Sequence, residues 1–130
     1  MIDWQDVSTW QVMVVDDEPD NLEVVAETLE YKGAQVKTAP NGQVALQILK
    51  DFPANLILTD LSMPVMDGWA VARALRGQGI DVPIVVMTAA ESAKRWADEV
   101  GADGYLAKPF GLDELLATVE RFRGPSGQAN

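Results

Sequence analysis

The sequence predicts an α/β fold, a doubly wound parallel sheet of five strands in the order 2-1-3-4-5 with five helices covering both faces. Two observations support this prediction. Five short apolar runs of strand length alternate along the 130 residues with five segments whose apolar residues have helical spacing. The loops between them are short, as expected for a parallel sheet built from right-handed crossovers.

The predicted strands differ in polarity, which indicates their places in the sheet. Residues 11–15, 55–59 and 82–87 are the most apolar and should be central, whereas residues 35–39 include the polar Lys37 and suit an edge. Residues 104–107 form a short fifth strand. This pattern favours the order 2-1-3-4-5, with its switch point between the first and third strands.

Amphipathic segments between these strands predict the helices. Pro19 suits the first turn of the first helix, Gly33 ends that helix, and Asn41 and Gly42 open the second. The third begins at residues 67–68, and Gly101 ends the fourth. The inner faces are expected to carry Leu22, Val25, Ala26 and Leu29; Val44, Ala45, Ile48 and Leu49; Val71, Ala72 and Leu75; Ala93, Trp96, Ala97 and Val100; and Leu112, Leu115, Leu116, Val119 and Phe122.

We expect one folded domain over residues 11–123. Residues 1–10 form an N-terminal extension, in which Trp4 and Trp10 dock either on the domain itself or on a partner. Residues 124–130 contain Gly, Pro and Ser with nothing to bury, and form a flexible C-terminal tail.

The composition narrows the chemistry. Without cysteine there is no disulfide or thiol chemistry, so a cytoplasmic location is the default. Without histidine, any metal is expected to be a hard cation held by oxygen ligands. The net charge of −10, with no basic cluster, argues against nucleic-acid binding and serves either solubility or an acidic binding surface. No apolar run approaches membrane-spanning length.

Polar side chains stand at the carboxyl ends of four predicted strands. Asp16 and Asp17 follow the first strand, Asp60 the third, Thr88 the fourth and Lys108 the fifth. Taken singly, each has a structural explanation, such as complementing a helix dipole, forming a turn or lying on the surface. Together they meet at one edge of the sheet, where ligand crevices form in such folds.

These residue types indicate phosphoryl chemistry. Three carboxylates brought together repel one another, so one gains a proton or a divalent cation such as Mg²⁺ binds between them. A carboxylate oxygen of Asp60 is placed to attack a phosphoryl group and form an acyl phosphate. The ammonium of Lys108 would neutralise charge on the transferring oxygens, and the Thr88 hydroxyl can donate a hydrogen bond to one of them.

The motifs at residues 14–19 (VVDDEP), 60–68 (DLSMPVMDG), 87–89 (MTA) and 108–110 (KPF) together resemble the receiver domain of two-component response regulators, which is flavodoxin-like in topology. The resemblance covers about residues 11–123. It implies that Asp60 accepts a phosphoryl group from a sensor histidine kinase or a histidine phosphotransfer protein. It also implies that Asp17 and Asp60 ligate Mg²⁺ (or Mn²⁺) directly, with the backbone carbonyl of Ser62, while Asp16 acts through water.

The resemblance implies further roles. Thr88 and Lys108 hold the phosphoryl group, and Tyr105 is the aromatic switch residue coupled to Thr88. The face made by the fourth helix, fifth strand and fifth helix then changes its affinity for a downstream protein partner, in a monomer or a phosphorylation-dependent dimer. Ser62 and Ala90 tune the lifetime of the phosphoryl group, and the Lys108–Pro109 bond is cis. The chain is then no enzyme with a separate substrate, because it catalyses only the phosphorylation and dephosphorylation of its own Asp60.

Several alternatives stay open. We expect a stand-alone receiver similar to chemotaxis regulators, or else the excised receiver of a larger regulator or hybrid kinase. A flavodoxin-like electron carrier is disfavoured because Asp16, Asp17 and Glu18 would repel a flavin phosphate. An aspartyl phosphatase would place a second acid two residues beyond the nucleophile, where this chain has Ser62. A phosphate-independent interaction module predicts partner binding that Asp60→Asn leaves unchanged.

Overall fold

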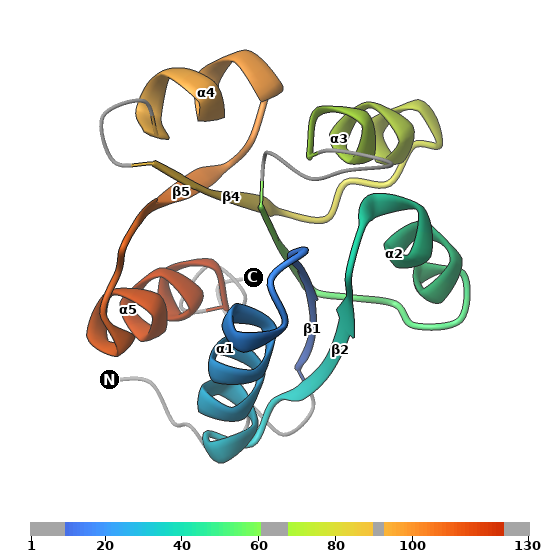
Figure 1. Cartoon of the computed structure of the whole chain (residues 1–130). Coiled ribbons are helices and arrows are strands. Elements are labelled where there is room, and N and C mark those ends of the chain that lie inside the picture. The colour runs from blue at the N-terminus through green and yellow to red at the C-terminus, as the bar shows by residue number, and fades with distance from the viewer. Residues whose placement is uncertain (1–9, 61–67, 90–92, 124–130) are drawn as a thin grey trace.

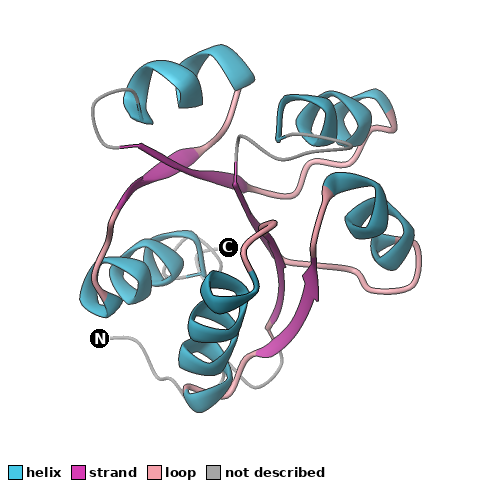
Figure 2. Ribbon diagram, in the orientation of Figure 1, coloured by secondary structure: helices cyan, strands magenta, loops and turns pink. Residues whose placement is uncertain are grey.

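The computed structural model describes residues 10–60, 68–89 and 93–123. These residues form a five-stranded parallel sheet in the order β2-β1-β3-β4-β5, as predicted, with helices on both sides (Figure 1 and Figure 2). The elements are β1 Gln11–Val15, α1 Pro19–Tyr31, β2 Gln35–Ala39, α2 Gly42–Leu49, β3 Leu56–Asp60, α3 Gly68–Gly77, β4 Ile84–Ala89, α4 Ala93–Val100, β5 Gly104–Lys108 and α5 Leu112–Arg123.

The core consists of two apolar layers, one on each face of the sheet. Side chains alternate across a strand, so Val12 and Val14 of β1 join the cluster under α1 and α5, while Met13 and Val15 join the cluster under α2 and α3. Figure 1 shows these helix pairs on opposite sides of the sheet. The strands β1 and β3 are buried on both faces, which explains their continuous apolar sequences.

Most helix ends follow the predicted residues. Pro19 is the first residue of α1, and Gly33 and Gly101 adopt φ values of 102° and 80° just after α1 and α4, a conformation that glycine adopts without strain. Asn41 caps α2 by accepting a hydrogen bond from the backbone N–H of Val44 at 3.0 Å. None of the helices in the described ranges is long and apolar enough to cross a bilayer.

Some predictions about the strands and helices are wrong in detail. The third strand is Leu56–Asp60 rather than 55–59, and the fifth ends at Lys108 rather than at residue 107. The fourth strand begins at Ile84 rather than Val82, because Pro83 has no N–H and the carbonyl of Val82 accepts from Arg76 Nη1 at 2.9 Å. Leu112 was expected on the inner face of α5, but it is 50% exposed. It is the first residue of the helix and lines an open pocket beside α1.

The predictions for the tryptophans and the two chain ends can be compared with the structure only at Trp10. Trp10 is half-buried against the cluster under α1 and α5, and its carbonyl accepts from the N–H of Gln35 at 2.8 Å, so it docks on its own domain. Trp4, the rest of the N-terminal extension, the tail at 124–130 and the side chain of Trp96 lie outside the described residues.

Replacement of Asn41 by alanine tests the capping of α2. Asn41→Ala removes the acceptor for the Val44 N–H, so we expect the free energy of unfolding to fall by about 1 kcal/mol in urea denaturation. Gln43→Ala is the matched control, since Gln43 is exposed in the same helix and alanine favours helix. Equal stability of Asn41→Ala and wild type would contradict the cap.

Candidate functional site

Three carboxylates meet at the carboxyl end of the two central strands β1 and β3. Asp16 and Asp17 directly follow β1, and Asp60 is the last residue of β3. One oxygen from each lies within 4.8 Å of the others. Asp16 is fully buried and Asp60 is 8% exposed, whereas Asp17 is exposed. The sequence-predicted cluster therefore exists at the predicted switch point of the sheet.

Asp16 is fixed in place by the turn between β1 and α1. Its Oδ1 accepts from the backbone N–H of Glu18 at 2.9 Å, an arrangement typical of aspartate at turns. Its Oδ2 accepts from Asn21 Nδ2 at 3.1 Å. Asn21 was not identified from the sequence, because a polar residue in the first turn of a helix is ordinarily solvated. Its contact with Asp16 makes it part of the site.

Lys108, the last residue of β5, bridges two of these carboxylates. Its Nζ lies 3.3 Å from Asp16 Oδ2 and 3.3 Å from Asp60 Oδ2, so it is not an ordinary surface lysine. Burial lowers the pKa of Lys108, but the negative charges of Asp60 and Asp16 outweigh this effect and raise its pKa above the usual lysine value. The ammonium is therefore charged at neutral pH.

Thr88 lies on β4, one residue beyond Met87, which is the register partner of Asp60. It is half-buried and stands next to Ala107 of β5. Tyr105, two residues before Ala107, is 42% exposed. The coupling of Thr88 to Tyr105 stays a prediction. Ser62 and Ala90 lie outside the described residues, and the Lys108–Pro109 bond is cis, as predicted.

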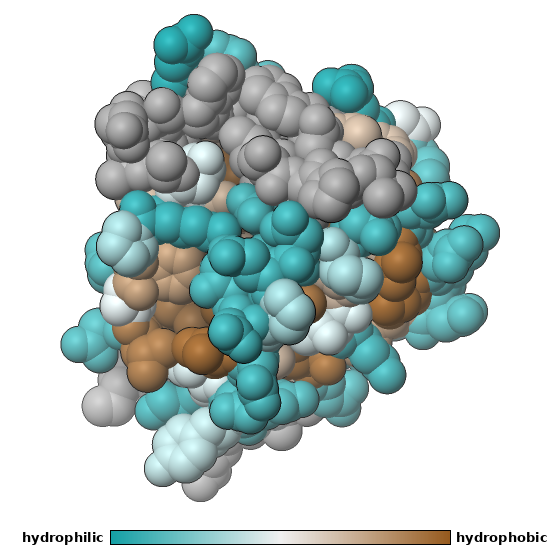
Figure 3. All heavy atoms as spheres, in the orientation of Figure 1, coloured by the Kyte–Doolittle hydropathy of each residue, from teal (hydrophilic) through white to brown (hydrophobic). Residues whose placement is uncertain are grey.

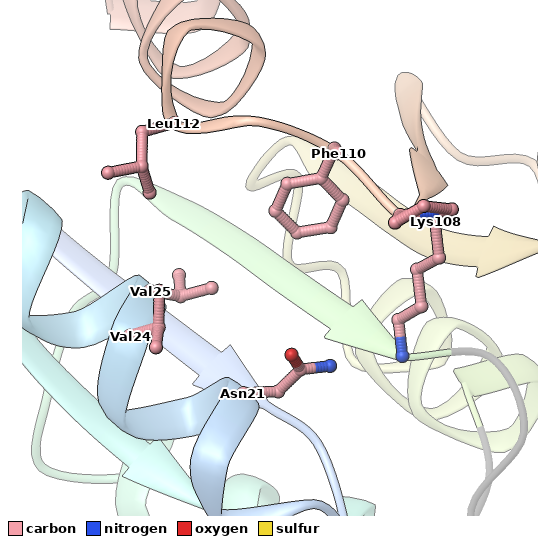
Figure 4. Close-up of a pocket in the computed structure, with 7 residues that line it drawn as sticks. Asn21, Val24, Val25, Lys108, Phe110 and Leu112 are labelled. Carbon is pink, nitrogen blue, oxygen red and sulfur yellow. The ribbon is translucent and has the colours of Figure 1, made fainter.

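An apolar pocket of about 400 Å³ opens beside Lys108, between α1 and the start of α5. Figure 4 shows Asn21 of α1 and Lys108 pointing toward each other at one end of it. Its lining residues are Asn21, Val24, Val25, Lys108, Pro109, Phe110 and Leu112. Val24 and Leu112 are 51% and 50% exposed. This pocket was not predicted from the sequence. The feature that could have indicated it is Val24, an apolar residue next to the inner-face Val25.

The family model described as response regulator receiver domain matches residues 12–120. The chain belongs to this family. Two curated relatives are the transcriptional regulatory protein PrrA of Mycobacterium leprae, 43% identical over 88% of this chain and 50% of its own length, and the response regulator MprA of Mycobacterium tuberculosis, 41% identical over 84% and 48%. The receiver domain thus spans about half the length of these curated relatives.

Solved structures agree with this assignment. The chemotaxis protein CheY4 of Vibrio cholerae has a TM-score of 0.79 and 35% sequence identity, with the match covering 87% of this chain and 98% of that chain. NtrX of Brucella abortus has a TM-score of 0.80 and 28% identity, covering 86% of this chain and 26% of its own. The fold prediction and the family prediction are both confirmed.

The bridging role of Lys108 predicts how stability depends on pH. Because its pKa is raised in the folded state, its stabilising contribution is complete below the ordinary lysine value and is lost as the pH rises through the folded value. We expect Lys108→Met to lower the free energy of unfolding at neutral pH by about 1–3 kcal/mol, because the buried carboxylates of Asp16 and Asp60 lose the ammonium that they share.

The difference between Lys108→Met and wild type should shrink above about pH 10.4, the ordinary lysine pKa. Urea denaturation over a pH series, with chelator present, measures it. Lys50→Met removes an exposed lysine and should show no such convergence. A difference that stays constant up to strongly alkaline pH would contradict the bridge.

Proposed function

We propose that this receiver domain is a phosphorylation-controlled signalling switch, in which Asp60 accepts a phosphoryl group from a phosphohistidine donor in the presence of Mg²⁺. The observation that carries this proposal is the juxtaposition of Asp60 with both Asp16 and Asp17, within 4.8 Å, and with Lys108 Nζ, 3.3 Å away. Membership of the receiver family supports the same chemistry.

The acidic cluster suits a hard divalent cation. All three side chains offer carboxylate oxygen, the donor that Mg²⁺ and Mn²⁺ prefer, and Asp17 is open to solvent, as an ion that keeps its water ligands requires. Asp17 and Asp60 would bind the ion directly, Asp16 through water, and the backbone carbonyl of Ser62 would complete the protein ligands. When bound, Mg²⁺ supplies positive charge opposite the oxygens of the phosphoryl group.

Asp60, Lys108 and Thr88 have different roles in the transfer of the phosphoryl group. A carboxylate oxygen of Asp60 attacks phosphorus while the bond from phosphorus to the donor's imidazole nitrogen breaks, which leaves an acyl phosphate on Asp60 and a free histidine on the donor. The ammonium of Lys108, already 3.3 Å from Asp60 Oδ2, neutralises the negative charge that develops on one oxygen of the phosphoryl group. The Thr88 hydroxyl donates a hydrogen bond to another of these oxygens. Water later hydrolyses the acyl phosphate, so no separate substrate is turned over.

The output follows from the same groups. A phosphoryl group adds about 1.5 to 2 negative charges at Asp60. As Thr88 moves to donate to it, the half-exposed ring of Tyr105 takes a new position. The face formed by α4, β5 and α5 then changes its affinity for a downstream protein.

We infer that the phosphohistidine donor docks over the pocket beside Lys108. The donor must bring its phosphorus to Asp60. This pocket lies beside Lys108, which contacts Asp60, and is lined by Asn21 from the first turn of α1. Exposed Val24 and Leu112 give it an apolar surface that a partner could cover. In Figure 3, hydrophobic surface is visible on the side of α1 that faces α5.

Intact-mass analysis with a small-molecule phosphodonor tests the central proposal. We expect one added phosphoryl group that requires both Mg²⁺ and Asp60, so that chelator or Asp60→Asn abolishes the adduct. Asp51→Asn, which removes an exposed carboxylate after α2, should keep full labelling. An adduct that persists in Asp60→Asn would overturn the assignment, and partner binding unchanged by Asp60→Asn would favour a phosphate-independent module.

A charge placed in the docking surface tests the donor site. Val24→Lys should lower the rate of transfer from any phosphohistidine protein that phosphorylates the wild type, by about tenfold or more, because a desolvated charge at an interface costs binding energy. Labelling by the small-molecule donor should be unchanged, since Val24 does not touch Asp60. Gln47→Lys, exposed on α2, is the charge control. Equal loss with both donors would contradict docking at Val24.

A further inference from the structure

Among the residues that the structure describes, no strand pairs with the outer edge of β2. This strand lies at one end of the sheet order and pairs with β1. In a parallel pair, the backbone groups of alternate residues face the neighbouring strand. Gln35 donates its N–H to Trp10, and the carbonyl of Ala39 accepts from the N–H of Asp16, so residues 35, 37 and 39 face β1. The N–H and C=O groups of Val36 and Thr38 therefore point away from the sheet.

A groove of about 490 Å³ runs between this outer edge and α1. Leu22, Ala26 and Val36 give it an apolar floor, and Glu23, Glu27 and Glu30 of α1 form an acidic wall. The groove lies on the β2 side of α1, whereas the pocket beside Lys108 lies on the α5 side. In Figure 3, hydrophilic side chains run along the front of α1, between these two regions.

The glutamates of the acidic wall are expected to destabilise α1, the helix that carries them. Helix α1 carries Asp20, Glu23, Glu27 and Glu30 but no Lys or Arg. The three glutamates are exposed, and within the described residues none of them takes part in an ion pair. They repel one another at spacings of four and three residues, and Glu30 stands in the last turn, where the helix dipole favours cations. Violations of local rules like these are typical of binding surfaces.

We propose that this groove docks an extended segment of a partner protein with Lys or Arg at alternate positions, which adds to the outer edge of β2 as a further strand. The outward-facing backbone groups of Val36 and Thr38 would bind the main chain of this segment. Alternate side chains of a strand are about 6.6 Å apart. Glu23 and Glu27 are about 6 Å apart along α1, so successive basic side chains match successive glutamates.

This docking surface goes beyond the phosphoryl chemistry and stands on the fold and charge of α1 and β2. The groove shares no lining residue with the pocket beside Lys108. A partner held on β2 would therefore leave Asp60 accessible to a phosphohistidine donor.

Titration of the full chain, labelled with ¹⁵N, tests the proposal. The probe is a short peptide of alternating Lys and Thr at low salt, and the backbone amide signals of Val36 and Thr38 should shift. Glu23→Gln, Glu27→Gln and Glu30→Gln combined should weaken binding about tenfold or more. The matched control removes three exposed carboxylates elsewhere, Asp51→Asn, Asp81→Asn and Asp113→Asn, and should bind as wild type does.

Two further peptides separate strand addition from simple charge attraction. A peptide of the same composition with its lysines grouped at one end should bind at least about threefold more weakly, because it cannot match the spacing of the glutamates. A peptide methylated on alternate backbone nitrogens should lose binding, because it cannot pair with β2. Equal loss in the two triple variants, equal binding of the three peptides, or unshifted Val36 and Thr38 signals would each overturn the proposal.

Discussion

The contact of the Lys108 ammonium with Asp16 and Asp60 is the interaction on which the site depends. Both carboxylates are nearly or fully buried, where an uncompensated charge costs several kcal/mol, on the order of the stability of a whole domain. The sheet order places β4 between β3 and β5, so the side chain at the end of β5 must reach across one strand, roughly 10 Å from β3. A long, flexible lysine meets this requirement, which explains why a charged residue ends the fifth strand.

The same contact leaves the site short of positive charge. Three carboxylates against one ammonium give two uncompensated negative charges. A divalent cation would balance them, and an incoming phosphoryl group would then meet a site that is near neutral rather than repulsive. Asn21 belongs to this balance, because it donates a hydrogen bond to the same Asp16 oxygen that Lys108 contacts. The burial of Asp16 and Asp60 and their ion pairs with Lys108 are therefore parts of one arrangement.

The sequence predicted the parts of this arrangement that depend on pattern. Apolar runs and glycine stops located the strands and helices, and the buried character of the first and third strands predicted that Asp16 and Asp60 would be neighbours. It could not predict what depends on side-chain contacts. The start of β4 was displaced by the hydrogen bond from Arg76 to Val82, a contact that no local pattern encodes. The role of Asn21, the exposure of Leu112 and the pocket that both residues line could be predicted only by knowing that α1 and α5 lie side by side.

The helix α1 shows how one element serves several surfaces. A residue advances about 100° around a helix, so each side chain faces one direction only. Val25 and Leu29 enter the core, Asn21 and Val24 face the pocket near Lys108, and Glu23, Glu27 and Glu30 face the groove along β2. The residues that line the pocket therefore differ from those that line the groove. In the two proposals made above, α1 carries both the docking of the donor and a second partner, and the buried carboxylate of Asp16 anchors its first turn through Asn21 and the Glu18 N–H.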